Sequence, residues 1–469
     1  MTVHAFGDDA LGRLDAVGVA EALRAGEVGV AEVVDAAIAR CIAVDPTLAG
    51  LAAERFDQAR SDAERPAAGY FSGVPGFIKD NCDLAGLPTQ QGTKSYLGQL
   101  KTQDGDVARM LKTQGLVLLG KTRLSEFGFS GAAEYVDDEP VHNPWNPGHT
   151  SGASSAGSAA FVAAGVVPIA HANDGGGSIR IPASCCGLVG MKPSRGRTPT
   201  DRMNRNMPLR IVADGVVTRS VRDTAAYLRE SERIYRHPRL KPIGDVRGPG
   251  PRQRIAVITD SIGGRACDAE TRAAVLATAD LLESAGHYVD LVSAPVPDFF
   301  TRDFLTYWSS FALYLTRMGK HDLDPSFDRE LTDNLTKGLA AYAARNAHRM
   351  PLAISRLWAS QYLTRRFFGR YDVTLSPTLG HVTPALGHFD PSQSFETVLE
   401  HLLDWVSFTP LQNASGDPAI SVPGAMSSTG LPIGLHLSSA QGEEARLLEL
   451  AYELEQIRPF PKIWDHVQP

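Results

Sequence analysis

Residues 150–194, TSGASSAGSAAFVAAGVVPIAHANDGGGSIRIPASCCGLVGMKPS, decide how the rest of the chain is interpreted. An almost wholly apolar run of twelve residues, 159–170, lies between a hydroxyl-rich start and a glycine-rich middle. It is too short to span a bilayer and contains Pro168, so it predicts a buried helix that leads into a strand. Three glycines, 175–177, precede Ser178 and permit backbone conformations that a Cβ forbids. We therefore expect a backbone shaped around a ligand or a reacting group.

The composition is that of an ordinary globular enzyme. The chain has 469 residues, of which 43% are hydrophobic and 21% are charged. A net charge of −7 argues against a nucleic-acid partner and against an anionic membrane surface. The first residues contain no basic segment followed by an apolar run, which argues against a secretory signal. Five scattered cysteines suit a reducing compartment, so we expect a cytoplasmic protein.

Alternating helix and strand patterns predict the fold class. Helical spacing over 15–45, an apolar strand before Lys79 and a helix–strand–helix pattern over 107–127 favour an α/β fold with a sheet covered by helices. The residues from 217 to 234 predict a further helix. We expect one domain over 1–469. It comprises N-terminal helices in 1–65, a catalytic core over 70–230, a partly helical insertion over about 237–370, and a return to the core sheet over 371–469.

Two segments of the chain each allow two interpretations. Six aromatic residues recur at helical spacing: Phe300, Phe304, Tyr307, Trp308, Phe311 and Tyr314. Such a stripe is typical of a core or a subunit contact, and the alternative is the wall of a substrate pocket. Residues 192–210 carry six basic side chains against Asp201. They favour a solvated surface loop over a surface that steers an anionic substrate.

Motif spacing excludes several chemistries. No glycine-rich loop is followed by Lys-Ser/Thr in the P-loop spacing, and no dinucleotide-binding fingerprint follows a strand. The chain contains no H-E-x-x-H and no C-x-x-C motif, so we expect neither a metal nor another cofactor. Ser178 stands in Gly-Gly-Ser-Ile-Arg, where an α/β-hydrolase elbow would need G-x-S-x-G. No spacing marks a nearby histidine (His142, His149, His171) as a general base, and structural roles are favoured.

A serine nucleophile with a lysine base remains. A hydroxyl is a weak nucleophile until a base takes its proton, and a lysine can do this if burial disfavours its ammonium form. Lys79 follows the apolar run VPGFI, which is consistent with burial of its side chain. Spacing alone leaves open whether Lys79 and Ser154 meet Ser178 in space.

Five segments together resemble the amidase signature family: GVPGFIKDN (73–81), NPWNPGHTSGASSAGSAA (143–160), NDGGGSIRIPASCCGLVGMKPS (173–194), YDVTLSPT (371–378), and GDPAISVP with GLPIGLHL (416–423 and 430–437). The resemblance implies a large twisted mixed sheet covered by helices on both faces, and no cofactor. A homodimer is a further family-level expectation. The run NDGGGSIRIPASCCG is similar to the branch that holds the 6-aminohexanoate cyclic-dimer hydrolases.

The resemblance also implies the reacting residues. Ser178 matches the nucleophile, Lys79 matches the terminal base, and Ser154 matches a bridging serine in a cis peptide link. The family's mechanism implies that the backbone amides of Gly175, Gly176, Gly177 and Ser178 form the oxyanion hole. Ser155, Asp174 and Arg180 match positions that support this loop by hydrogen bonds.

The sequence departs from the common family pattern at five positions: Ala153, Ala156, Asn173, Gly175 and His436. None of these departures removes a reacting atom. The expected reaction is hydrolysis of a small carboxamide to a carboxylic acid and ammonia or an amine through an acyl-enzyme. One alternative is a cyclic or linear oligoamide hydrolase of the 6-aminohexanoate type. The other is the glutamine-using subunit of a tRNA-dependent amidotransferase, against which Ile181 stands where glutamine is typical.

Overall fold

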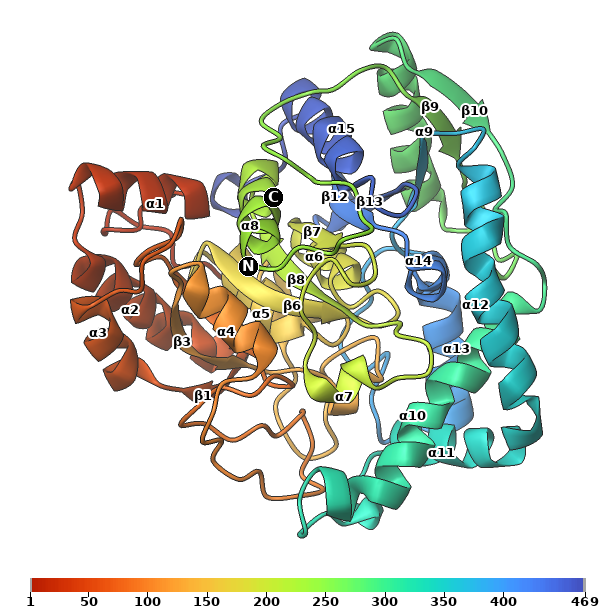
Figure 1. Ribbon diagram of the computed structural model, residues 1–469, viewed down its shortest axis with the longest axis horizontal. Coiled ribbons are helices and arrows are strands. Elements are labelled where there is room, and N and C mark those ends of the chain that lie inside the picture. Colours follow the sequence, from red (N-terminus) through yellow and green to blue (C-terminus); the bar gives the residue numbers. More distant parts are fainter. Residues whose placement is uncertain (1, 467–469) are drawn as a thin grey trace.

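The computed structural model describes residues 2–466, and its centre is an 11-stranded mixed sheet (Figure 1). The strand order is β1-β3-β2-β6-β8-β7-β12-β13-β11-β9-β10. The strands are β1 (Leu51–Glu54), β2 (Pro75–Lys79), β3 (Val117–Thr122), β6 (Ile169–Asp174), β7 (Val189–Lys192), β8 (Ala213–Thr218), β9 (Arg254–Val257), β10 (Tyr288–Leu291), β11 (Val373–Pro377), β12 (Ala419–Met426) and β13 (Pro432–Ser438). A separate hairpin joins β4 (His142–Asn143) to β5 (Asn146–Thr150).

Strand directions bring three polar residues to one edge of the sheet. Strand β2 pairs in parallel with β6. Strands β6 and β7 each pair antiparallel with β8, so they run in the same direction as each other. The carboxyl ends of β2, β6 and β7 therefore lie at the same edge, where the last residues are Lys79, Asp174 and Lys192.

Helices cover both faces of the sheet, as predicted. On one face Phe77 of β2 packs against Phe161 of α5 (Ala156–Ala163), with ring centroids 5.1 Å apart. On the other face Thr218 of β8 hydrogen-bonds to Thr224 of α8 (Val221–Ile234) at 2.8 Å. The other core helices are α1 (Ala16–Ala25), α2 (Val30–Leu48), α3 (Phe56–Glu64), α4 (Asp106–Thr113), α6 (Arg180–Cys186), α9 (Ala269–Ser284), α14 (Pro410–Ser415) and α15 (Glu444–Ile457).

The predicted helix over 217–234 is wrong at its start. Residues 213–218 form β8, and α8 begins only at Val221. The physical reason is tertiary: Val216 and Val217 pair with His171 and Ala170 of β6 in the middle of the sheet. Sheet pairing outweighs a local helical pattern here, because the pattern carries only a weak preference.

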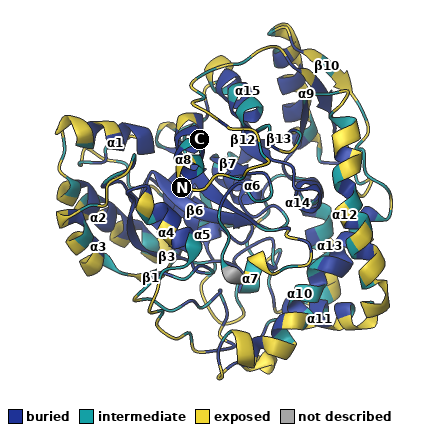
Figure 2. Ribbon diagram, viewed as in Figure 1, coloured by how far each residue is buried: buried dark blue, intermediate teal, exposed yellow. Residues whose placement is uncertain are grey.

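The helical segment after residue 299 consists of α10 (Phe300–Asp322), α11 (Asn334–Arg345), α12 (Met350–Phe367) and α13 (Phe395–Trp405), on the right-hand side of Figure 1. Figure 2 shows both buried and exposed stretches along these helices, and the aromatic stripe of α10 likewise divides between core and surface. Phe300, Phe304 and Tyr307 are buried in one apolar cluster with Leu209, whereas Tyr314 is 50% exposed. Among residues 2–466, no helix is both long enough and apolar enough to cross a bilayer.

The basic segment 192–210, with the short helix α7 (Arg202–Arg205), is not simply a solvated loop. Arg197 is buried and forms ion pairs with Glu232 at 2.8 Å and Glu444 at 2.7 Å. Arg195 donates to the backbone carbonyl of Asn413 at 2.9 Å. At least two of the six basic side chains therefore tie this segment to the core, because buried guanidinium groups need such partners.

Candidate active site

Lys79 ends β2 and is fully buried. Its Nζ atom lies 2.7 Å from Ser154 Oγ and 2.7 Å from Asn173 Oδ1. Burial lowers the pKa of Lys79 to about 7, since the ammonium form loses its hydration. A large share of Lys79 is therefore a neutral amine near pH 7, and this amine can accept a proton from the hydroxyl beside it.

Asn173 is a partner of Lys79 that sequence reasoning treated only as a departure from a pattern. Its Oδ1 accepts hydrogen bonds from Lys79 Nζ and, at 3.2 Å, from Asn81 Nδ2. A neutral amine has two N–H groups and one lone pair. With one N–H directed at Asn173, the lone pair is free to face Ser154. The available signal was positional, because Asn173 lies near the end of β6, which neighbours the strand of Lys79.

Ser154 and Ser178 lie next to each other, so the structure brings all three predicted reacting residues together. Ser154 precedes α5 and is buried, and Ser178 is 9% exposed. The backbone N–H of Ser154 donates to Ser178 Oγ at 3.4 Å. Ser154 thus contacts Lys79 through its hydroxyl and Ser178 through its amide.

The expected cis peptide link at Ser154 is not present. Residues 2–466 contain no cis peptide bond. A trans peptide is the lower-energy form for a residue other than proline. In this trans form, the Ser154 hydroxyl still reaches Lys79 and its N–H still points to Ser178.

The predicted oxyanion loop, residues 175–178, presents free amides. None of its four backbone N–H groups donates a hydrogen bond within residues 2–466. Gly177 has φ +141°, and a Cβ there would lie 2.4 Å from Thr409 Oγ1, so only glycine fits. Thr409 in turn donates to the Gly176 carbonyl at 2.5 Å. Thr409 therefore holds the loop through its carbonyl side, and the backbone amides of the loop remain available to an anion.

Asp174 and Arg180 form a buried pair beneath this loop. Arg180 Nε and Nη2 donate to the two carboxylate oxygens at 2.8 and 2.9 Å. Burial alone would raise the pKa of the Asp174 carboxyl, but the Arg180 guanidinium holds it below its ordinary value. His436 Nε2 accepts from Arg180 Nη1 at 2.9 Å, and burial lowers the pKa of His436 well below its usual range. His436 is therefore neutral and acts as an acceptor.

Ser155 donates to the Asn173 carbonyl at 3.3 Å. Its contact, like those of Asp174 and Arg180, reaches the strand end and loop that carry Ser178. All three side chains are buried. Their positions fit support of the loop.

Aromatic side chains of α10 lie near the segments that carry the site residues. A Cβ on Gly176 would lie 3.9 Å from the Phe304 ring. Further along α10, Trp308 meets the ring of Phe129 edge to face at 5.7 Å. Gly128, the neighbour of Phe129, approaches Ser154, because a Cβ there would lie 3.4 Å from the Ser154 side chain. The buried part of the stripe is core, as the first interpretation predicted, and its Phe304 lies close to the loop before Ser178.

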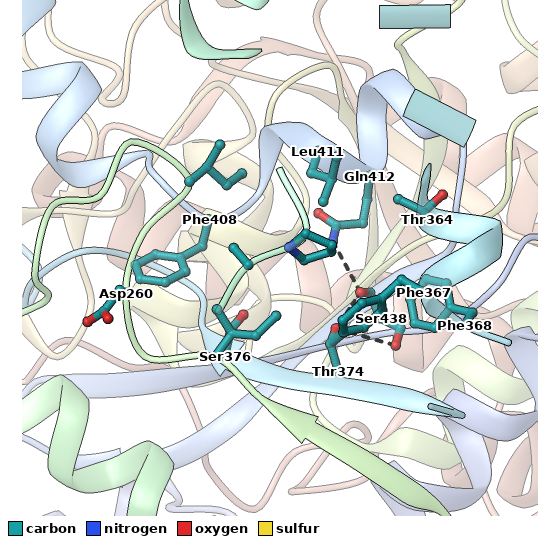
Figure 3. A pocket seen from close by; sticks show the side chains of 14 residues that line it. Asp260, Thr364, Phe367, Phe368, Thr374, Ser376, Phe408, Leu411, Gln412 and Ser438 are labelled. Carbon is teal, nitrogen blue, oxygen red and sulfur yellow. Dashed lines mark hydrogen bonds between the residues drawn. The ribbon is translucent and has the colours of Figure 1, made fainter. Parts of the chain in front are cut away.

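A separate small cavity lies between α12, α14 and the strands β11 and β13 (Figure 3). Its volume is about 30 Å³, and none of the residues that line it is a predicted catalytic residue. Gln412 in its wall donates to Ser438 Oγ at 3.1 Å. The cavity has room for water but not for a carboxamide substrate.

Cys82, His171 and Asp214 form a buried group whose ligand-type atoms lie within 4.8 Å of one another. A metal ion would need a free nitrogen on His171. Its Nδ1 accepts the Lys79 backbone N–H at 3.3 Å, so the proton of the neutral ring lies on Nε2. That Nε2–H points to Asp214 Oδ1 at 3.2 Å. Neither nitrogen is free, and the group does not fit a metal.

Comparison with known proteins places this geometry in a family. The family model described as "Amidase" matches residues 32–448. The chain belongs to the amidase family. A putative amidase, AmiC, of Mycobacterium leprae is 54% identical to it over 463 residues, with 98% of each chain covered. The family prediction from the sequence is confirmed.

Another group of relatives carries a more specific name. A 6-aminohexanoate-cyclic-dimer hydrolase of Paenarthrobacter ureafaciens is 32% identical over 479 residues, covering 95% of each chain. A solved structure of 6-aminohexanoate cyclic dimer hydrolase complexed with substrate aligns with a TM-score of 0.87 and 30% identity, covering 96% of this chain and 98% of the other. A bacterial aryl acylamidase shares the fold, with a TM-score of 0.85 at 23% identity, covering 96% and 98%. The predicted fold is thereby confirmed.

Proposed function

We propose that the chain is a serine amidase that hydrolyses a carboxamide through an acyl-enzyme on Ser178. The observation that carries the proposal is the 2.7 Å contact between the buried Lys79 amine and Ser154 Oγ. It joins a lysine whose pKa burial lowers to about 7 to a serine whose amide contacts Ser178 Oγ. No histidine is needed in this arrangement.

In the acylation step, Ser178 Oγ attacks the amide carbonyl carbon. Its proton passes to Ser154 Oγ as the Ser154 proton passes to Lys79 Nζ. The carbonyl oxygen becomes an oxyanion that accepts hydrogen bonds from the free amides of residues 175–178. The relay then returns the proton to the leaving nitrogen, the C–N bond breaks, and ammonia or an amine departs.

In the deacylation step, water replaces the amine. Its proton enters the same relay through Ser154 to Lys79 while its oxygen attacks the ester carbon. The tetrahedral intermediate collapses, Ser178 regains its proton, and the carboxylic acid leaves. One water is consumed for each amide bond broken, and the enzyme returns to its starting state.

The proposed substrate has an apolar or aromatic acyl group. Support comes from Phe304, which lies beside Gly176 of the oxyanion loop, and from Phe129, which follows Gly128 near Ser154 and contacts Trp308. A cyclic oligoamide is the second candidate, favoured by the relatives at 32% and 30% identity that are named for the 6-aminohexanoate cyclic dimer. A panel of aliphatic and aromatic carboxamides, assayed beside that cyclic dimer, separates the two. The substrate with the highest kcat/KM identifies the class.

The test of the reaction is Ser178→Ala. We expect ammonia or amine release from every panel member to fall to background, because the nucleophile is gone. Ser184→Ala is the matched control. Ser184 is a buried serine on α6 that accepts a hydrogen bond from the Gly434 N–H at 2.9 Å and takes no part in the relay. Undiminished turnover in folded Ser178→Ala protein would refute the proposal.

A further inference from the structure

The Lys79 backbone has an unusual hydrogen-bond partner. Parallel pairing between β2 and β6 covers Gly76 with Ile169 and Phe77 with Ala170, and then stops. Two residues later, the Lys79 N–H donates not to a strand carbonyl but to the ring nitrogen Nδ1 of His171, at 3.3 Å. A side chain of β6 thus holds the end of β2 at the residue whose amine reaches Ser154.

The other ring nitrogen of His171, Nε2, contacts Asp214. Because Nδ1 is an acceptor, Nε2 carries the ring proton and donates to Asp214 Oδ1 at 3.2 Å. Asp214 lies on β8, one strand further along the sheet, and pairs with Asn173 in register. The side chains of His171 and Asp214 are both almost fully excluded from solvent. The result is a chain of contacts from β8 through β6 to the backbone of Lys79.

Among the acidic groups that face Lys79, Asp214 has no arginine or lysine partner within residues 2–466. Asp174 also faces Lys79, but it is neutralised by Arg180. The Cys82 thiol lies beside both Lys79 and Asp214, and burial raises its pKa well above the usual value, so it is uncharged. Asp201 faces Asp214 from the segment before α7, and burial raises the pKa of that carboxyl. The Tyr227 phenol of α8 faces Asp214 as well, and burial raises its pKa.

We propose that His171 and Asp214 are positioning residues for Lys79, with His171 fixing the Lys79 backbone and the Asp214 carboxylate setting the pH at which the Lys79 amine becomes free to act. This inference rests on the proposed amidase function of the same site. One carboxylate oxygen of Asp214, Oδ2, is buried without a hydrogen-bond partner within residues 2–466. No hydrogen-bond donor therefore offsets a negative charge on that oxygen.

The sign of the effect follows from Coulomb's law. A negative charge near Lys79 favours the ammonium form. Asp214→Asn removes that charge while keeping the shape of the side chain and an acceptor for His171. The Lys79 amine then becomes free at a lower pH, and the acid limb of the pH–rate profile shifts downward. A purely structural role would lower activity at every pH and leave the limb in place.

The test is the pH dependence of kcat/KM, which reports groups of the free enzyme. For Asp214→Asn we expect the acid limb to move to lower pH by at least about half a unit. At a pH well below the limb, kcat/KM as a fraction of its plateau value should then be about threefold higher in the variant than in the wild type. Asp417→Asn is the control, because Asp417 is a buried carboxylate that faces Lys192 and Arg195. Its acid limb should stay where the wild-type limb lies. An unmoved limb in folded Asp214→Asn protein overturns the proposal.

A second pair of variants tests His171 itself. His171→Asn keeps a side-chain acceptor close to the position of Nδ1, whereas His171→Leu removes it. We expect His171→Leu to lower kcat at least about tenfold more than His171→Asn, with KM nearly unchanged in both. Equal kcat values in the two folded variants would also overturn the proposal. The Ser178→Ala variant separates failure of this proposal from failure of the proposed amidase function. If Ser178→Ala abolishes turnover but the acid limb of Asp214→Asn does not move, only the positioning role is rejected.

Discussion

Two buried lysines end strands at the same edge of the sheet, and their surroundings differ. Lys79 ends β2 and Lys192 ends β7, and burial lowers the pKa of each to about 7. Lys79 Nζ faces a serine hydroxyl, whereas Lys192 Nζ donates to the Pro193 carbonyl at 3.0 Å. A hydroxyl has a proton to give, and a carbonyl has none. A lowered lysine pKa therefore identifies a base only where a transferable proton lies within reach.

The largest expected effect is on turnover. Lys79→Met replaces the lysine by an apolar, unbranched side chain of similar length and so removes the base. We expect kcat to fall about 10³-fold or more, within the range typical of lost general base catalysis. Lys192→Met should cost less than about tenfold, because Lys192 is not placed to take a proton. Equal losses in two folded variants would remove the distinction between the two lysines.

In stability, the same two variants should behave alike. The pKa of each lysine is about 7 in the folded chain and about 10.4 in the unfolded chain, so between these pH values the unfolded state binds one more proton. The free energy of unfolding therefore rises with pH across this window, by about 1.4 kcal/mol per pH unit for each lysine. Each Met variant should lose one such contribution. Denaturant unfolding at pH 7.5, 8.5 and 9.5 measures it, and slopes equal to wild type would contradict the burial argument.

A smaller loss of kcat is expected from substitution of Asn173, which accepts a hydrogen bond from the Lys79 amine. Asn173→Ala removes one acceptor from Lys79 and leaves its contact with Ser154. Because a single hydrogen bond contributes about 1 kcal/mol, we expect kcat to fall about fivefold to tenfold. Asn173→Ser should restore part of the loss by returning a hydroxyl. An Asn173→Ala enzyme with wild-type kcat would show that Lys79 needs no second partner.

Much of the architecture could be predicted because its signals are local. The apolar run 159–170 forms the predicted buried helix and strand, α5 and β6. Glycine, serine and lysine motifs indicated the residues that now lie together around Ser178. Their meeting depends on the pairing of β2 with β6, and no spacing in the sequence encodes that pairing.

The partners of the site residues could not be predicted for the same reason. Asp214 lies beside His171 only because β8 pairs with β6 in one particular register, and the last two residues of β8, 217–218, were predicted as the start of a helix. Thr409 reaches Gly176 across more than two hundred residues of chain. Such contacts arise from tertiary packing, which residue propensities and motif spacing do not report.

The central claim is that a neutral Lys79 activates Ser178 through Ser154. The most direct measurement is the rate of covalent labelling of Ser178 by a serine-directed acylating or phosphonylating probe, followed by mass spectrometry from pH 5 to pH 9. The account predicts one modified peptide, containing Ser178, and a labelling rate that rises through pH 7 in the wild type but stays low and flat in Lys79→Met. Labelling at another residue, or the same pH-dependent rise in Lys79→Met, would contradict it.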